Sequence, residues 1–172
     1  MLTAVVERFL ALLALLALGV SLAGVVALVR GRVSDRAREA ALPLAAAVAV
    51  VSTGGSLYLS EVAGYLPCVL CWYQRIAMYP LVVVLGVAAL RRDAAAWRTV
   101  LPITGIGTVI AAWHVAVERL PALGSGVCDP TAPCTIRWVE EFGFLTIPTM
   151  ALIGFITISV LVLVARAGHR RA

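Results

Sequence analysis

The chain has 172 residues, of which 62% are hydrophobic and only 13% are charged. This composition is far too apolar for a soluble domain of this length and predicts an integral membrane protein. The net charge of +5 results from fourteen basic residues against nine acidic ones, and the basic residues are all arginine, most of them near the ends of apolar runs. We therefore attribute the positive charge to membrane topology, and we expect no nucleic-acid partner.

The first apolar run covers residues 9–29, enough for one bilayer crossing of about 20 residues. We interpret it as a retained transmembrane helix because no basic n-region precedes it and arginines follow it; a cleaved signal peptide is the alternative. Residues 30–39 then form a short loop with four arginines against two acidic residues. Because arginine-rich loops stay in the cytoplasm, the N-terminus is expected on the outer side.

Four further membrane spans are predicted in chain order, at residues 42–62, 72–90, 100–117 and 146–165. Small residues at 52–56 predict close helix packing in the second span. For the last span, Thr146 is the expected N-cap and Pro148 suits the first turn. A second basic loop follows residue 90, and three arginines follow the last span, namely Arg166, Arg170 and Arg171. The chain therefore predicts an all-α bundle of five helices with its C-terminus in the cytoplasm.

Four cysteines fall in two close pairs, Cys68 with Cys71 and Cys128 with Cys134, and this topology puts both pairs outside. Disulfides are expected in that oxidising compartment. A disulfide across Cys68 and Cys71 would constrain the unfolded chain little, so redox use is favoured over a structural staple. Since a helix N-terminus stabilises a thiolate, Cys71, four residues before Arg75, is the better candidate for it. Taken alone, the second pair fits a structural disulfide and thiol exchange equally well. The presence of the first pair favours thiol exchange for the second pair too.

A zinc site made of all four thiolates is a further alternative. Its ligand spacing would be loose, and an oxidising compartment works against free thiolates, so we expect no metal.

Three polar residues near the outer border are candidates for binding an electron acceptor. Arg75 lies about one helical turn beyond Cys71, where it either snorkels to lipid headgroups or holds a thiolate or a carbonyl oxygen of the acceptor. His114 and Glu118 are four residues apart on one helical face. A histidine at this place can relay protons when a quinone is reduced, and the alternative is that both residues are interfacial polar groups.

The segment Cys68-Val69-Leu70-Cys71-Trp72-Tyr73-Gln74-Arg75, the stretch 113–118 and the later cysteine pair resemble the disulfide bond formation protein B (DsbB) family over about residues 42–166. The resemblance implies a four-helix thiol oxidase core at 40–172, preceded by an additional transmembrane helix and basic loop at 1–39. It also implies an inner-membrane enzyme, active on its outer face, that supports disulfide bond formation. Such an enzyme reoxidises a DsbA-like thioredoxin-fold partner and passes two electrons to a quinone, either ubiquinone or menaquinone.

The resemblance further implies a role for each cysteine. Cys128 would form the mixed disulfide with the partner, Cys134 would exchange with Cys68, and Cys71 would contact the quinone. Arg75 would hold the ring oxygen of the quinone, and His114 and Glu118 would be further residues of the quinone site. The chain departs from the family in its additional first span and in the closer spacing of its second cysteine pair. The alternative from another class is a non-catalytic membrane protein whose disulfides only pin its outer loops.

Overall fold

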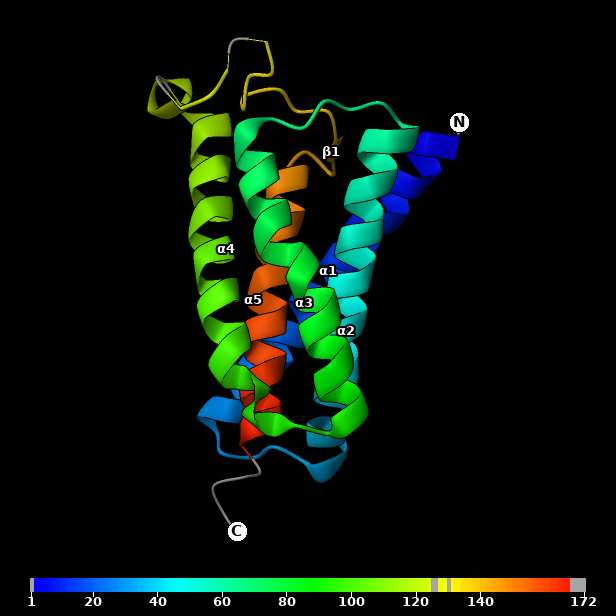
Figure 1. The fold of residues 1–172 in the computed structure, drawn as a ribbon, viewed down its shortest axis with the longest axis vertical. Helices are drawn as coiled ribbons and strands as arrows, with labels where there is room; N and C mark the ends of the chain where they lie inside the picture. The colour runs from blue at the N-terminus through cyan, green and yellow to red at the C-terminus, as the bar shows by residue number, and fades with distance from the viewer. Residues whose placement is uncertain (1, 125–126, 130, 168–172) are drawn as a thin grey trace.

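The computed structural model describes residues 2–124, 127–129 and 131–167. Among these residues, five helices are long and apolar enough to cross a membrane. They are α1 (Leu2–Val29), α2 (Asp35–Leu57), α3 (Val69–Arg91), α4 (Trp97–Arg119) and α5 (Ile147–Arg166). The predicted helical membrane bundle is confirmed (Figure 1). Arg170 and Arg171, predicted on the cytoplasmic side, lie outside the described residues.

Local sequence features set several helix ends. The hydroxyl of Ser34 accepts a hydrogen bond from the backbone nitrogen of Ala37 and caps α2. Arg92 ends α3 in the left-handed conformation. Thr146 occupies the predicted N-cap position of α5 and Pro148 lies in its first turn, but the Thr146 hydroxyl makes no capping hydrogen bond. That hydroxyl is used elsewhere, in the candidate site.

Short elements connect the helices. The π-helical turn η1 (Tyr58–Val62) extends α2, and the 3-10 turns η2 (Ala94–Ala96) and η3 (Pro121–Gly124) flank α4. Strand β1 (Glu140–Glu141) pairs antiparallel with β2 (Leu145–Thr146), with Glu140 opposite Thr146. This hairpin lies near the start of α1, where Arg8 forms an ion pair with Glu141 at 3.7 Å.

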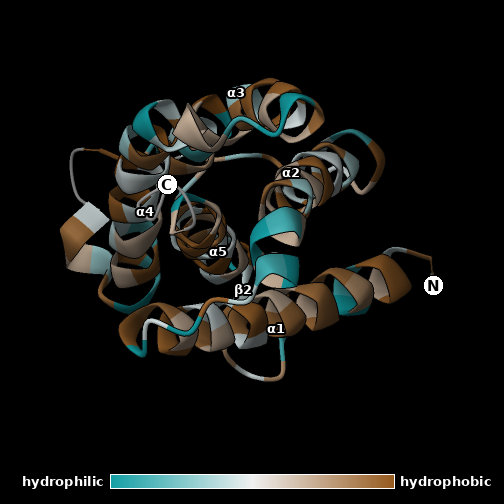
Figure 2. Ribbon diagram, turned by 90° about the horizontal axis from the view of Figure 1, so that it is seen from below, coloured by the Kyte–Doolittle hydropathy of each residue, from teal (hydrophilic) through white to brown (hydrophobic). Residues whose placement is uncertain are grey.

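Helix α5 occupies the centre of the bundle, with the other four helices around it (Figure 2). Its side chains supply much of the core, and Phe155, Ile158 and Val162 are completely buried. Helix α1 packs on α5 through a hydrogen bond of 2.7 Å between the hydroxyls of Ser21 and Thr157. Most of α1 is apolar and exposed, as a helix facing lipid would be.

The two ends of the bundle differ in charge and chemistry. The described start of α1, the connection from α2 to α3 and the long 120–146 connection share one end (Figure 1). Both basic loops and the described end of α5 lie at the opposite end. Both cysteine pairs therefore lie together, at the end away from the basic loops.

Candidate functional site

The Cys68 and Cys71 pair is built into the N-terminus of α3. Cys68 is the N-cap residue, with extended backbone angles, and its sulfur accepts a hydrogen bond of 3.3 Å from the backbone nitrogen of Cys71. The two sulfur atoms lie 3.0 Å apart, and both cysteines are free thiols. Because an N-cap faces the unpaired amides and partial positive charge of its helix, the fold directs thiolate stabilisation to Cys68. The prediction of a stabilised thiolate at Cys71 is therefore wrong, because Cys68 and not Cys71 occupies the N-cap.

The electrostatic surroundings of Cys68 act in the same direction. The hydrogen bond from the Cys71 thiol is the main cause that lowers the pKa of the Cys68 thiol below its ordinary value. The neighbouring His114 adds to this effect, while burial of the Cys68 side chain opposes it. A low thiol pKa is a property of cysteines that exchange disulfides.

His114 connects the two cysteine pairs from its position on α4. Its Nε2 atom lies 3.6 Å from the sulfur of Cys68 and 3.2 Å from the carbonyl oxygen of Cys134. A carbonyl oxygen can only accept, so Nε2 donates a hydrogen to it. On the other side of the ring, Nδ1 lies 3.1 Å from the side-chain nitrogen of Gln74, which donates to it. These partners hold the imidazole in one orientation, beside the redox-capable sulfur.

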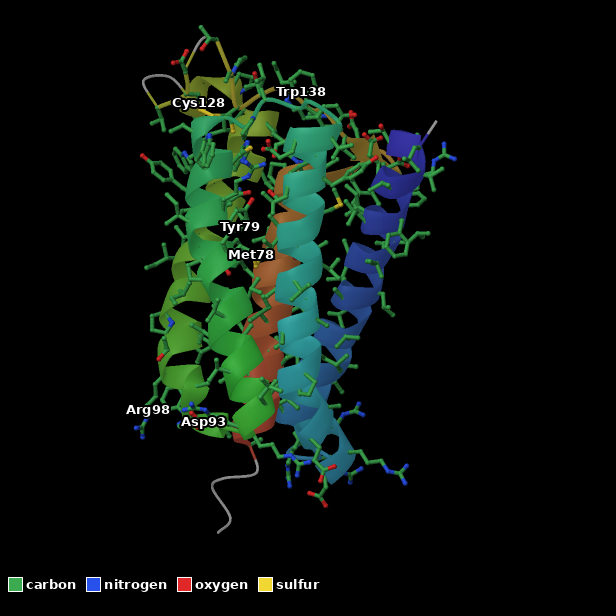
Figure 3. All side chains as sticks on the ribbon, turned by 45° about the vertical axis from the view of Figure 1, so that its right-hand side comes forward. Met78, Tyr79, Asp93, Arg98, Cys128 and Trp138 are labelled. Atoms are coloured by element: carbon green, nitrogen blue, oxygen red, sulfur yellow. A yellow bond between two sulfur atoms is a disulfide. The ribbon has the colours of Figure 1, made fainter. Side chains whose placement is uncertain are left out.

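The second pair forms a disulfide between Cys128 and Cys134. Cys134 is buried in one cluster with Cys68, and Cys128, half-buried in the loop, packs against the same cluster (Figure 3). The disulfide removes two of the four thiolates that the zinc alternative requires. The sulfurs of Cys68 and Cys71 and one ring nitrogen of His114 lie within 4.8 Å of one another. These three atoms are the potential metal ligands that remain close together.

A cavity of about 330 Å³ reaches the dithiol at Cys71. At the end near the cysteines it is lined by Cys71 and Arg75. The Nε and Nη2 atoms of Arg75 donate to the hydroxyl and the carbonyl oxygen of Ser56, at 2.9 and 3.0 Å. The third guanidinium nitrogen, Nη1, makes no hydrogen bond to the part of the chain that the structure describes. Ser56 thus holds Arg75 in place and leaves the Nη1 nitrogen to donate to another molecule.

The predicted acceptor-binding residues do not all lie in one place. Arg75 lines the large cavity, while His114 and Glu118 line a separate cavity of about 20 Å³ beside Cys68. Glu118 is buried, and its carboxylate accepts a hydrogen bond of 2.7 Å from the hydroxyl of Thr146. The small cavity is about the size of one water molecule.

The family model for disulfide bond formation protein DsbB matches residues 38–165. The chain belongs to the DsbB family. "Probable disulfide formation protein C 1" of Bacillus cereus is 45% identical to it over 127 residues, which are 73% of this chain and 91% of that protein. "Disulfide bond formation protein C" of Bacillus subtilis is 45% identical over 113 residues, which are 64% of this chain and 81% of that protein. No solved structure matches the chain.

Membership of the DsbB family gives the site its general role. The protein is a multi-pass membrane oxidoreductase that acts in disulfide bond formation. The family match begins at residue 38, so α1 lies outside it.

Sequence reasoning missed three residues that organise the DsbB-like site: Ser56, Gln74 and Thr146. Each contacts a predicted site residue that is distant in sequence. Gln74 offered a usable signal, because a polar side chain inside an apolar span needs a buried partner. Ser56 was instead included among the small residues expected to aid helix packing.

Proposed function

We propose that this DsbB-family protein is a quinone-reducing thiol oxidase that reoxidises a DsbA-like thioredoxin-fold partner at the outer face of the cytoplasmic membrane. The observation that carries the proposal is the position of Cys71. This residue lines the large apolar cavity with Arg75, and its sulfur lies 3.0 Å from that of Cys68. One cysteine pair therefore connects the thiol chemistry of the outer loop with a site suited to an apolar acceptor. We assign the oxidase core to residues 40–172 and an additional helix with its loop to 1–39.

The proposed exchange begins at the loop disulfide. A thiolate of the reduced partner attacks the half-buried sulfur of Cys128, forms a mixed disulfide and releases Cys134 as a thiolate. The partner's second thiolate then resolves this bond, so the partner leaves oxidised and Cys128 is also reduced. The partner has lost two electrons and two protons, which the chain now holds on its second cysteine pair.

The next transfer joins the two cysteine pairs. With Cys68 and Cys71 in their oxidised, disulfide-bonded form, the thiolate of Cys134 attacks Cys68 and releases Cys71. Cys128 then attacks Cys134, which restores the loop disulfide and leaves the α3 pair reduced. Burial of Cys134 and Cys68 in the same hydrophobic cluster supports this route. His114 contacts both groups, and its proximity favours negative charge on the Cys68 sulfur.

The large cavity fits a quinone by size and chemistry. Its volume of about 330 Å³ lies in the usual range for small-molecule sites, about 300 to 1,000 Å³, and its lining is mainly apolar. A quinone supplies the capacity to accept two electrons and two protons. The chain's part is to hold the ring beside Cys71 and to offer Nη1 of Arg75 to a ring carbonyl oxygen. Over the whole cycle, one partner dithiol becomes a disulfide and one quinone becomes a quinol.

The test is anaerobic quinol formation by the purified protein in detergent, with a reduced thioredoxin-like dithiol protein as electron donor. Ubiquinone and menaquinone are compared in parallel. Cys71→Ser should abolish quinol formation, whichever donor is used. Cys128→Ser should abolish it with the protein donor but retain it with a small dithiol that reduces the α3 pair directly.

The two cysteine variants separate the proposed steps. Wild-type quinol formation no faster than the uncatalysed reaction, with either quinone, would rule out the oxidase assignment. It would favour a non-catalytic membrane protein with structural disulfides. Equal loss of quinol formation with both donors in Cys128→Ser would contradict the assignment of Cys128 as the entry point for the partner's electrons. It would not contradict quinone reduction by the wild type.

A further inference from the structure

The large cavity continues well beyond the dithiol. Cys71 and Arg75 line one end, and the walls extend along residues 10–20 of α1, 44–59 of α2 and η1, and 147–161 of α5. At about 1.5 Å per residue, the α1 wall is about 15 Å long. The cavity is therefore a long apolar space that starts at the proposed quinone ring site.

The arrangement of α1 explains why this space exists. Helix α1 is held on α5 by the hydrogen bond between Ser21 and Thr157, and Gly24 allows close approach to Val160. A Cβ added at Gly24 would lie 2.6 Å from a methyl carbon of Val160. Figures 2 and 3 show α1 inclined to the bundle and separate from α2 over part of its length. The small side chains of Ala17 and Ala47 line the space between them.

We propose that this cavity holds the isoprenoid tail of the quinone and that α1 is the wall that selects for it. The inference rests on the proposed function, because the ring site beside Cys71 fixes where the tail begins. The cavity continues from that ring site, and its walls are apolar along α1, as a hydrocarbon chain requires. Since α1 lies outside the DsbB family match, the wall is an addition to the family core.

A phospholipid acyl chain has the same apolar chemistry as an isoprenoid tail, so the test must distinguish the two. The decisive measurement compares a quinone that carries a long isoprenoid tail with the same ring without a tail. An acyl chain resident in the cavity would give no dependence of KM on the quinone tail. The readout is the ratio of the two KM values, measured with the same preparation of protein.

Two cavity-filling variants test the wall from opposite sides, namely Ala17→Phe on α1 and Ala47→Phe on α2. The matched control is Ala23→Phe, on an exposed position of α1 that does not line the cavity. We expect each filling variant to raise the KM ratio of tailed to tail-less quinone about tenfold, as for the loss of roughly two buried methylene groups. The control should keep the wild-type ratio. Unchanged ratios in both filling variants, or an equal change in the control, would overturn the proposal.

A second measurement uses the unsubstituted protein, so it does not depend on how a variant folds. A quinone analogue with a photoreactive group at the far end of its tail is irradiated with the protein, and crosslinked peptides are identified by mass spectrometry. Crosslinks within residues 10–20 or 44–51 support the tail site, and crosslinks only outside the cavity overturn it. Failure of the wild type to reduce either quinone would instead reject the proposed function, so the two failures are distinguishable.

Discussion

The imidazole of His114 lies against the sulfur of Cys68, with 3.6 Å between Nε2 and Sγ, although 46 residues separate them in sequence. The same nitrogen donates to the carbonyl oxygen of Cys134. One ring therefore contacts both cysteine pairs, and the charge on the Cys68 sulfur depends on it.

The first prediction concerns the pH at which Cys68 ionises. Because the Cys71 thiol and His114 lower its pKa, the thiolate should persist as the pH falls well below about 8.5, the ordinary pKa of a free cysteine. The measurement is the ultraviolet thiolate absorbance of the reduced protein against pH, after subtraction of the Cys68→Ala signal. His114→Gln should move the midpoint to higher pH. A midpoint at the ordinary value in the wild type would contradict the prediction.

The second prediction concerns Gln74, whose side-chain nitrogen donates to Nδ1 of His114. Gln74→Leu keeps the approximate size of the side chain but leaves a buried ring nitrogen without its partner, which costs about 1–3 kcal/mol. The free energy of unfolding in detergent should fall by this amount, and quinol formation should slow because the imidazole loses its fixed orientation. Tyr73→Leu, at an exposed neighbouring position, is the control and should change stability by about 0.5 kcal/mol or less.

The third prediction concerns Arg75. Arg75→Ala removes a charged hydrogen-bond donor worth about 1.5–3 kcal/mol, so the KM for quinone should rise by roughly one to two orders of magnitude. Arg75→Lys should recover only part of the loss, because an ammonium group cannot reproduce the two contacts with Ser56 and still offer a third donor in the same plane.

The control for Arg75 lies at the far end of the bundle. Arg98 is exposed there, at the same end of the bundle as Asp93 (Figure 3). Arg98→Ala should leave the KM for quinone unchanged. An equal rise in both arginine variants would point to a general loss of positive charge, and it would contradict a specific contact at Arg75.

The fourth prediction compares two glycines on α4. A Cβ at Gly107 would overlap the ring of the completely buried Phe155, whereas a Cβ at Gly105 would meet no atom within 4 Å. Gly107→Ala should therefore destabilise the bundle by about 1–3 kcal/mol through overpacking. Gly105→Ala should be neutral or stabilise the bundle by up to about 1 kcal/mol, through better helix propensity. Denaturant titration in mixed micelles measures both, and equal effects would contradict the packing assignment.

The membrane bundle could be predicted from sequence because lipid forces backbone hydrogen bonds to close within each helix. The apolar runs gave the number of spans among the described residues, and the arginines gave the order of the loops. Helix ends were less predictable. The first helix begins at Leu2 instead of residue 9, because two polar side chains near its start find partners: Glu7 accepts from Tyr65, and Arg8 pairs with Glu141.

The contacts within the site could not be predicted from the sequence. Pairing of Arg75 with Ser56, and of Gln74 with His114, depends on how α2, α3 and α4 rotate against one another. No spacing rule within one helix determines those rotations. The separation of Arg75 from His114 and Glu118 into two cavities has the same cause, because a shared membrane border does not fix which cavity a residue lines.

The hydrogen bond between Ser21 and Thr157 has a consequence for how the bundle is assembled. The two hydroxyls are 136 residues apart, so at about 5–20 residues per second the first helix waits on the order of ten seconds for its partner to be synthesised. During that interval the Ser21 hydroxyl can donate to the carbonyl oxygen of Ala17, 3.0 Å away on its own helix. A nascent α1 can therefore rest in lipid without an unsatisfied donor, and the bundle closes around α5 only when that last span arrives.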